Sequence, residues 1–100
     1  MRLEVAWWDL GADDPDADEL AASPAIQQAF AEWERVPNLT TKLWLVSRDA
    51  HHWGALMLWH GEKPDRANLP RNVSAELIGR PPDHRMAFEV VERARCTDTP

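Results

Sequence analysis

The fold is decided by residues 39–60, which read LTTKLWLVSRDAHHWGALMLWH. From Leu39 to Arg48, and again from His52 to His60, every second side chain belongs to a mainly aliphatic set and the side chains between them to a mainly aromatic or polar set. This alternation predicts two β-strands. Residues 49–51 supply the short turn between them. Two neighbouring strands joined by a short turn predict a β-hairpin.

A strand and a helix are predicted before this hairpin. Residues 2–10 alternate as a strand, and an acidic turn follows in which Asp16 or Asp18 can cap a helix. Apolar residues then recur every three or four positions from Leu20 to Val36, which predicts an amphipathic helix. Pro24 breaks or kinks the first turn of this helix.

The chain after the hairpin is interrupted by four prolines, which leave room for one short helix. We predict this helix at Val73–Ile78, ended by Gly79, and a last strand from His84 to Arg95. The order of elements is the split β-α-β pattern of α+β, ferredoxin-like folds. The sequence therefore predicts one domain over residues 1–96, with a four-stranded antiparallel sheet, both helices on one of its faces, and a frayed tail at residues 97–100.

Alternation divides the predicted strands into two faces of different composition. One face is aliphatic apart from one phenylalanine, and we expect it to lie under the helices; it comprises Leu3, Val5, Leu43, Leu45, Leu56, Leu58, Phe88 and Val90. The other face carries most of the tryptophans and several charges, and includes Glu4, Trp8, Lys42, Trp44, Trp53, Met57, Trp59, Arg85 and Glu89. An exposed apolar face of this size needs a cover, so we expect a second copy of the sheet to pack on it. Trp7 and Trp33 are assigned to the core between helices and sheet.

Composition and charge exclude several classes of protein. The formal net charge of −6 argues against nucleic-acid binding, which needs a basic surface. The acid excess lies in residues 1–35, which hold nine acids and two bases. No stretch approaches the length of a membrane span, and Cys96 has no second cysteine to pair with, so we expect a cytoplasmic protein that does not enter the membrane.

The hairpin also resembles a known family. Residues 36–46, VPNLTTKLWLV, and residues 53–59, WGALMLW, look like the central hairpin of the dimeric α/β-barrel superfamily, and within it the chain is most similar to YdhR-like mono-oxygenases. Lys42, Trp44, Gly54 and Trp59 lie on the shared pattern. The chain departs from that pattern at residues 62–70, where prolines replace a full second helix.

The resemblance implies an obligate homodimer with a ligand cavity at each sheet. The superfamily includes cofactor-independent mono-oxygenases, cyclases of polyketide tailoring, haem-degrading enzymes and members without known activity. No histidine matches the iron ligand of the haem-degrading branch, so we expect no cofactor. The function this implies is proton abstraction from an aromatic or polyketide-like substrate; the alternative is a non-catalytic dimer that binds ligands or partners.

Three residues of the tryptophan-bearing face are candidates for catalysis. Lys42 shares that face with Glu4 and Glu89, and a partly buried lysine beside a carboxylate forms either a structural ion pair or an acid/base pair. In the catalytic interpretation, Glu89 or Glu4 removes a phenolic or activated C–H proton. Lys42 then stabilises the oxyanion that results.

The candidate substrate-binding residues are mostly aromatic. Trp8, Trp44, Met57 and Trp59 either clamp a planar hydrophobic molecule or simply fill the dimer interior. Arg85 either binds a carboxylate or lies in solvent. The histidines do not form a metal chelate in the sequence pattern, so we expect no metal site.

Overall fold

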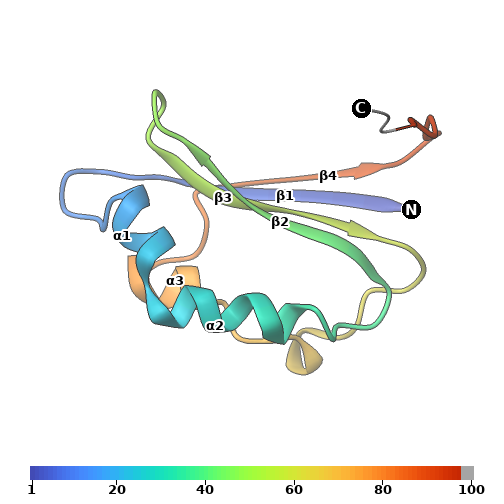
Figure 1. Cartoon of the computed structure of the whole chain (residues 1–100), viewed down its shortest axis with the longest axis horizontal. Coiled ribbons are helices and arrows are strands. Elements are labelled where there is room, and N and C mark those ends of the chain that lie inside the picture. The colour runs from blue at the N-terminus through green and yellow to red at the C-terminus, as the bar shows by residue number, and fades with distance from the viewer. Residues whose placement is uncertain (98–100) are drawn as a thin grey trace.

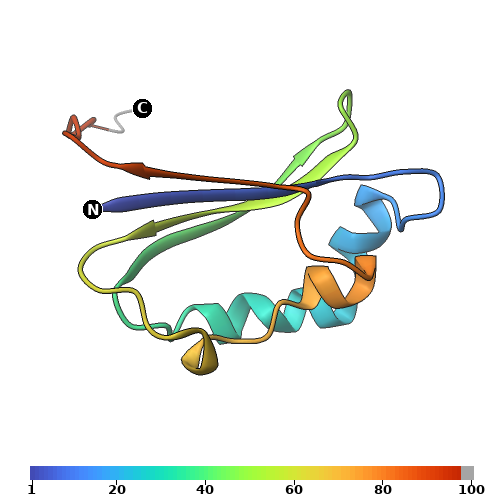
Figure 2. The same cartoon turned by 180° about the vertical axis from the view of Figure 1, so that it is seen from behind.

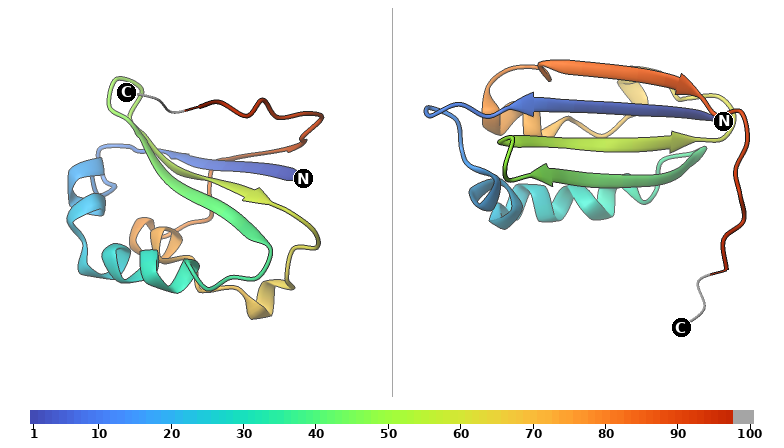
Figure 3. Two further views of the ribbon diagram at one scale, coloured as in Figure 1. Left: turned by 45° about the vertical axis from the view of Figure 1, so that its right-hand side comes forward. Right: turned by 90° about the horizontal axis from the view of Figure 1, so that it is seen from above.

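The computed structural model describes residues 1–97, which form a four-stranded antiparallel sheet with helices on one side (Figure 1). The sheet order is β2-β3-β1-β4, which is compatible with a ferredoxin-like fold. Figure 3 shows the four strands side by side from above. The elements in chain order are β1 (Arg2–Asp9), α1 (Ala17–Ala22), α2 (Pro24–Trp33), β2 (Leu39–Ser47), β3 (His52–Trp59), the 3-10 helix η1 (Arg66–Asn68), α3 (Val73–Ile78) and β4 (His84–Glu89).

The first half of the chain confirms the hairpin and divides the first predicted helix in two. Strands β2 and β3 pair in antiparallel fashion, as predicted. Asp16 caps α1, because its side chain accepts a hydrogen bond of 2.8 Å from the backbone N–H of Glu19. Ser23 ends α1 and begins α2, with Pro24 in the first turn of α2, where its missing N–H costs nothing.

The second half confirms the short helix but shortens the last strand. Helix α3 spans Val73–Ile78, and Gly79 ends it with a left-handed φ of 91°. Strand β4 ends at Glu89, so the strand predicted to reach Arg95 is too long. Among residues 1–97, β4 pairs only with β1, and the last backbone hydrogen bond of this pair runs from the Val90 N–H to the Met1 carbonyl, next to the start of β1 at Arg2. The predicted frayed tail lies, from residue 98 onward, outside the described residues.

The prediction of which sheet face lies under the helices is wrong. The face that carries the tryptophans, which we call the tryptophan face, packs against the helices: Trp8, Trp53 and Trp59 are 3%, 4% and 0% exposed and share a core with Leu20 and Ile26. A second copy of the sheet therefore does not cover this face, because the protein's own helices do. The assignment of Trp33 to this core is confirmed.

The indole groups explain why the tryptophans lie inward. Helix and sheet backbones stand apart (Figure 1), and the large indole side chains reach across the layer between them. Each buried indole also needs an acceptor for its N–H, and the interior provides one: Trp8 donates to the carbonyl of Arg80, Trp53 to Ser74 and Trp59 to Glu4, each at 2.9 Å. Aliphatic residues have no such requirement.

The opposite face, which we call the open face, is not covered by any described element. It includes Leu43, Leu45, Met86 and Phe88, which are 37–50% exposed, and its remaining apolar members in the strand register are Leu3, Val5, Leu56 and Leu58. Trp7 also lies on this face, stacked on His84 with ring centroids 4.9 Å apart, so its assignment to the core is wrong. The facing strand has no room for a side chain at Gly54, because a Cβ there would clash with the Ala6 carbonyl oxygen and come within 2.7 Å of the Trp7 Cβ.

Candidate functional site

Three hollows between the tryptophan face and the helix layer meet at Lys42 and Trp33. The smallest encloses about 60 Å³, the second about 340 Å³, and the largest is an open cleft of about 810 Å³. The wall of the cleft opposite the sheet comes from the segment between β3 and α3, which runs from the sheet to the helix layer (Figure 2). We call these connected hollows the cleft region.

Lys42 holds its amine between two indole rings at this meeting point. Its Nζ lies 3.2 Å from the ring centroid of Trp33 and 4.8 Å from that of Trp44. Within residues 1–97, no carboxylate lies at ion-pair distance from Lys42. Burial, together with the nearby charge of Lys63, lowers the pKa of Lys42 to about 7, whereas the indole faces favour the ammonium form.

The predicted ion pair between Lys42 and Glu4 does not form, because Glu4 has other partners. Strand register places Met57 next to Lys42 and Glu4 beyond Met57, so one strand separates the two charges. The Oε1 atom of Glu4 accepts hydrogen bonds from Trp59 Nε1 and Lys63 Nζ, both at 2.9 Å. Its Oε2 atom accepts from Arg2 at 3.1 Å.

These partners decide the charge of Glu4. Burial, the largest single effect, opposes ionisation, but the hydrogen bonds and charges of Lys63, Trp59 and Arg2 together outweigh it. They hold the pKa of Glu4 below its ordinary value. Glu4 is therefore an ionised structural anion and a weak base at neutral pH.

Glu89, the third predicted catalytic residue, lies away from the cleft region. It is the last residue of β4, opposite Arg2 in the sheet. It lines a separate surface hollow that also contains Phe88 and Met1. The structure therefore brings Lys42 together with neither predicted carboxylate.

The predicted substrate-binding residues divide into those that line the cleft region and those that pack in the core. Trp44, Met57 and Arg85 line it, and Trp44 also packs on Phe30 with ring centroids 4.6 Å apart. Trp8 contributes to the smallest hollow, although its N–H is bonded to Arg80. Trp59 is fully buried, with its N–H bonded to Glu4, so its described contacts are those of a core residue.

Sequence reasoning missed the cationic wall of the cleft. Lys63, Arg66 and Arg71 line it from the segment before α3, and Arg85 lines it from β4. Among the described residues, the only acid in the lining is Asp65. The available signal was the basic run KPDRANLPR at residues 63–71, which stands out in a chain of net charge −6.

Some of these cations have carboxylate partners and others do not. Lys63 pairs with Glu4, and Arg71 pairs with Glu76 at 3.4 Å. In the part of the chain that the structure describes, Arg66 and Arg85 form no ion pair, like Lys42. The cleft region therefore presents two unpaired guanidinium groups beside the Lys42 amine, and these suit an anionic ligand.

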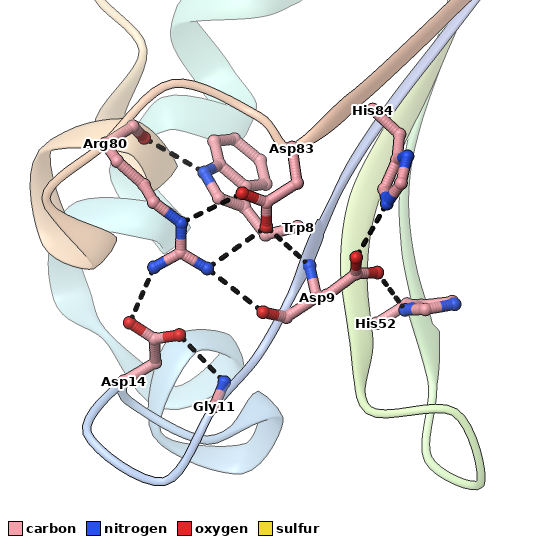
Figure 4. A network of polar contacts seen from close by, with 8 residues as sticks. All are labelled: Trp8, Asp9, Gly11, Asp14, His52, Arg80, Asp83 and His84. Carbon is pink, nitrogen blue, oxygen red and sulfur yellow. Dashed lines mark hydrogen bonds and ion pairs between the residues drawn. The ribbon is translucent and has the colours of Figure 1, made fainter.

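A second polar cluster, centred on Arg80, has a structural role (Figure 4). The Arg80 guanidinium donates to Asp14 at 2.8 Å, to both carboxylate oxygens of Asp83 at 3.1 Å, and to the carbonyl of Asp9 at 3.0 Å. These hydrogen bonds lower the pKa of Asp14 and of Asp83, and the positive charge of Arg80 lowers both pKa values by a smaller amount. Arg80 thus ties the loop before α1 and the loop before β4 to the end of β1.

Two histidines meet the carboxylate of Asp9 on the open face, a convergence that the sequence analysis does not predict. His84 Nε2 lies 2.6 Å from one Asp9 oxygen and His52 Nδ1 lies 3.0 Å from the other (Figure 4). His60, by contrast, contacts Thr40 at 2.7 Å. No group of three or more His, Cys, Asp or Glu side chains in residues 1–97 is placed to hold a metal ion.

Comparisons with known proteins assign no family to the chain. No protein-family model matches it, and no curated protein matches it. Within the described residues, no helix has the length and apolar character needed to cross a membrane. The chemistry of the cleft region is therefore the basis for a functional assignment.

Proposed function

We propose that this chain is a small-molecule enzyme that removes a proton from an aromatic or polyketide-like substrate in the cleft region. The observation that carries this proposal is Lys42. Its amine lies between two indoles, faces three connected hollows and lacks a carboxylate partner within residues 1–97. A structural lysine is normally exposed or paired, so this environment supports a chemical role.

In this proposal Lys42 is the proton acceptor. A pKa of about 7 gives a substantial fraction of neutral amine at neutral pH, with a lone pair that can accept a proton. Glu4, with its lowered pKa and three donors, is the poorer base. The catalytic base therefore moves from the carboxylates that the sequence favours to the lysine.

The rest of the cleft region supplies binding. The exposed part of Trp44 offers a flat apolar surface for a planar ring, and Met57 adapts to its shape. Arg85 can hold a carboxylate or phenolate of the substrate. The carbanion left by proton loss then either reacts with O₂, as in a cofactor-independent mono-oxygenase, or attacks within the same molecule, as in a cyclase.

We also propose that the protein is a homodimer that pairs through the open face. Four strands of six to nine residues make a flat face of roughly 500 Å². Because side chains protrude from it, its solvent-accessible area is larger than this and closer to the ~800 Å² per partner of stable interfaces. A soluble monomer rarely exposes this many neighbouring apolar side chains on one face, which here include Leu43, Leu45, Met86 and Phe88. A second copy of the chain is a suitable partner, because a two-fold axis places the apolar side chains of one open face against the same side chains of the other.

The second candidate function is a dimer that binds a ligand without catalysis. It is favoured by the indole N–H groups of Trp8, Trp53 and Trp59, which all donate to the protein itself. These tryptophans act in packing, which leaves only Trp33 and Trp44 to face a ligand in the largest hollows.

Ligand titration followed by tryptophan fluorescence tests the proposal. A panel of planar aromatic compounds, with and without a carboxylate, is titrated into wild type, Trp44→Ala and the open-face control Trp7→Phe. Saturable quenching that Trp44→Ala loses and Trp7→Phe keeps supports the cleft region as the binding site. Emission that no compound in the panel changes contradicts the proposal.

Turnover of the compounds that bind separates the two functions. Loss of the bound compound, followed by liquid chromatography, is expected for wild type and at least 100-fold slower for Lys42→Met, because a positioned base contributes about 10²–10⁴-fold. Binding with no turnover of any bound compound favours the non-catalytic dimer.

A further inference from the structure

We infer that the cleft region selects an oxo acid, a molecule with both a carbonyl and a carboxylate, and that the Lys42 amine adds to the carbonyl to form an imine. This inference rests on the proposed function, because it names the substrate class and the covalent step for the same site. The observation that supports it is the arrangement of basic side chains around the Lys42 amine.

The charges of the cleft favour a ligand with negative charge. Among the described residues, its lining holds four cationic side chains besides Lys42 and one carboxylate, Asp65, although the chain as a whole is acidic. Arg85 and Arg66 have no ion-pair partner in residues 1–97, so a carboxylate can bind them without displacing an existing contact. Arginine presents a planar fork of N–H donors that matches a carboxylate.

The amine itself is placed for addition to a carbonyl. A lysine becomes a nucleophile when it is desolvated or lies near another cation, because both conditions favour the neutral amine. Lys42 meets both: Trp33 and Trp44 enclose it, and Lys63 is the nearby cation. A neighbouring carboxylate would keep the amine protonated, and within residues 1–97 none lies at ion-pair distance.

The sheet sets the distance between the two attachment points. Lys42 lies on edge strand β2 and Arg85 on edge strand β4, three strand spacings apart. The register places Arg85 level with Trp44, two residues along β2 from Lys42, so the two backbones are about 16 Å apart. Both side chains line the same hollows from opposite edges. One molecule that lies in these hollows can therefore present a carbonyl to Lys42 and a carboxylate to Arg85.

The covalent step needs no other reagent. The nitrogen lone pair of Lys42 forms a C–N bond at the carbonyl carbon, and the carbonyl oxygen takes up a proton. The C–O bond then breaks, and the oxygen leaves as water with the two protons that the amine gives up. The imine nitrogen, once protonated, withdraws electrons from the adjacent C–H bond and makes its proton more acidic, a role that replaces proton acceptance by the free Lys42 amine.

Reductive trapping tests this inference, and the chain makes the result easy to assign. Lys42 and Lys63 are the only lysines. Wild type is incubated at pH 7 with phenylpyruvate and sodium cyanoborohydride, and peptide mass spectrometry then locates the secondary amine. We expect the adduct on Lys42 at tenfold or more over Lys63 and the N-terminal amine, and no adduct at position 42 in Lys42→Arg. Equal modification of both lysines and the N-terminus overturns the inference.

A second comparison tests the role of the acidic group. Trapping with phenylacetone, which has the ring and the carbonyl but no carboxylate, should be at least tenfold slower than with phenylpyruvate. Arg85→Gln should slow trapping of phenylpyruvate and leave that of phenylacetone unchanged. Equal rates for both probes in wild type overturn the assignment of an oxo acid.

The failure of this inference can be told apart from the failure of the proposed function. Phenylpyruvate that quenches tryptophan fluorescence saturably, without a trapped adduct, overturns the imine and leaves the cleft region as a binding site. Absence of both saturable quenching and trapping, across the aromatic panel, overturns both. Circular dichroism of each variant confirms that it is folded before either measurement.

Discussion

The two faces of the sheet come from the same four strands, yet they have opposite roles. The tryptophan face carries indoles and charges and lies under the helices, whereas the open face is mostly aliphatic and has no cover in the described chain. The comparison shows that the more polar set of side chains can be the inner one. Indoles reach further than leucines, and their N–H groups find acceptors on this side of the sheet, at the Arg80 carbonyl, Ser74 and Glu4.

A second contrast lies within the tryptophan face. Three donors compensate the charge of Glu4, and its hydrogen bonds connect β1 to Trp59 on β3 and to Lys63 in the segment after β3. Lys42 lies two strands away on β2, and among residues 1–97 its amine has aromatic rings and no carboxylate as neighbours. The candidate chemistry lies where the protein leaves a charge without a partner.

The largest expected effect comes from removing a core indole. Trp59→Ala removes a fully buried side chain and leaves Glu4 without one donor, so it should lower the free energy of unfolding by about 3–5 kcal/mol. Phe88→Ala on the open face, where the residue is 47% exposed, should lower it by less than about 1 kcal/mol in dilute solution. Urea unfolding followed by circular dichroism measures both. An equal loss of unfolding free energy in both variants would contradict the distinction between a buried tryptophan face and an exposed open face.

A charge on the open face should separate the dimer. Leu45→Glu is expected to reduce the mass measured by light scattering at micromolar concentration from twice 11.4 kDa to 11.4 kDa, because burying an unpaired carboxylate at the interface is unfavourable. Leu77→Glu is the control, since Leu77 is exposed on α3 in the helix layer. Wild type that is already monomeric contradicts dimerisation through this face.

Lys42→Met should stabilise the protein at neutral pH. The unfolded chain protonates this amine up to its ordinary pKa of 10.5, and the folded protein only up to about 7. Lys42 therefore costs free energy in full below pH 7, and the cost disappears between pH 7 and 10.5. We expect a gain of about 1–2 kcal/mol at pH 6, seen as a rise in Tm of several degrees, that shrinks to nothing by pH 10.5. A loss of stability at pH 6 would show that Lys42 is structural.

The smallest expected effect concerns the Arg80 cluster. The lowered pKa of Asp14 stabilises the fold above the unfolded value of 3.8, and that contribution is lost as the pH falls through the folded value. Asp14→Asn should therefore reduce Tm slightly at pH 6 and reduce it less at pH 2.5. Asp13→Asn, next to it and without an ion pair in residues 1–97, is the control and should match wild type. An identical Tm profile for the two variants would contradict the role of Asp14.

Much of the fold can be predicted from local signals in the sequence. The hairpin, the bounds of α3 and the Asp16 cap all depend on residues close together in the chain, and the structure confirms them. The end of β4 depends on where β1 begins, a distant part of the chain, and the prediction was too long. The orientation of the sheet was wrong because both faces are apolar enough to be buried, so hydrophobicity alone does not distinguish them.

The candidate site was predictable in its sheet residues and not in its loop residues. Lys42, Trp44, Met57 and Arg85 were selected because strand alternation places them on one face, and the structure shows them lining the cleft region. Lys63, Arg66 and Arg71 come from a segment without periodicity, whose path depends on tertiary packing. The partner of Glu4 could not be predicted for the same reason, because Lys63 reaches it from that segment.

The protonation of Lys42 tests the central claim most directly. Reductive methylation with ¹³C-formaldehyde labels Lys42, Lys63 and the N-terminal amine, and comparison with the Lys42→Arg protein identifies the Lys42 signal in the NMR spectrum. If the cleft region holds a reactive amine, the chemical shift of Lys42 changes with a midpoint near pH 7, and an added aromatic oxo acid perturbs this signal. A midpoint at the ordinary lysine value of about 10.4, with no response to the oxo acid, would show that Lys42 is an ordinary structural side chain.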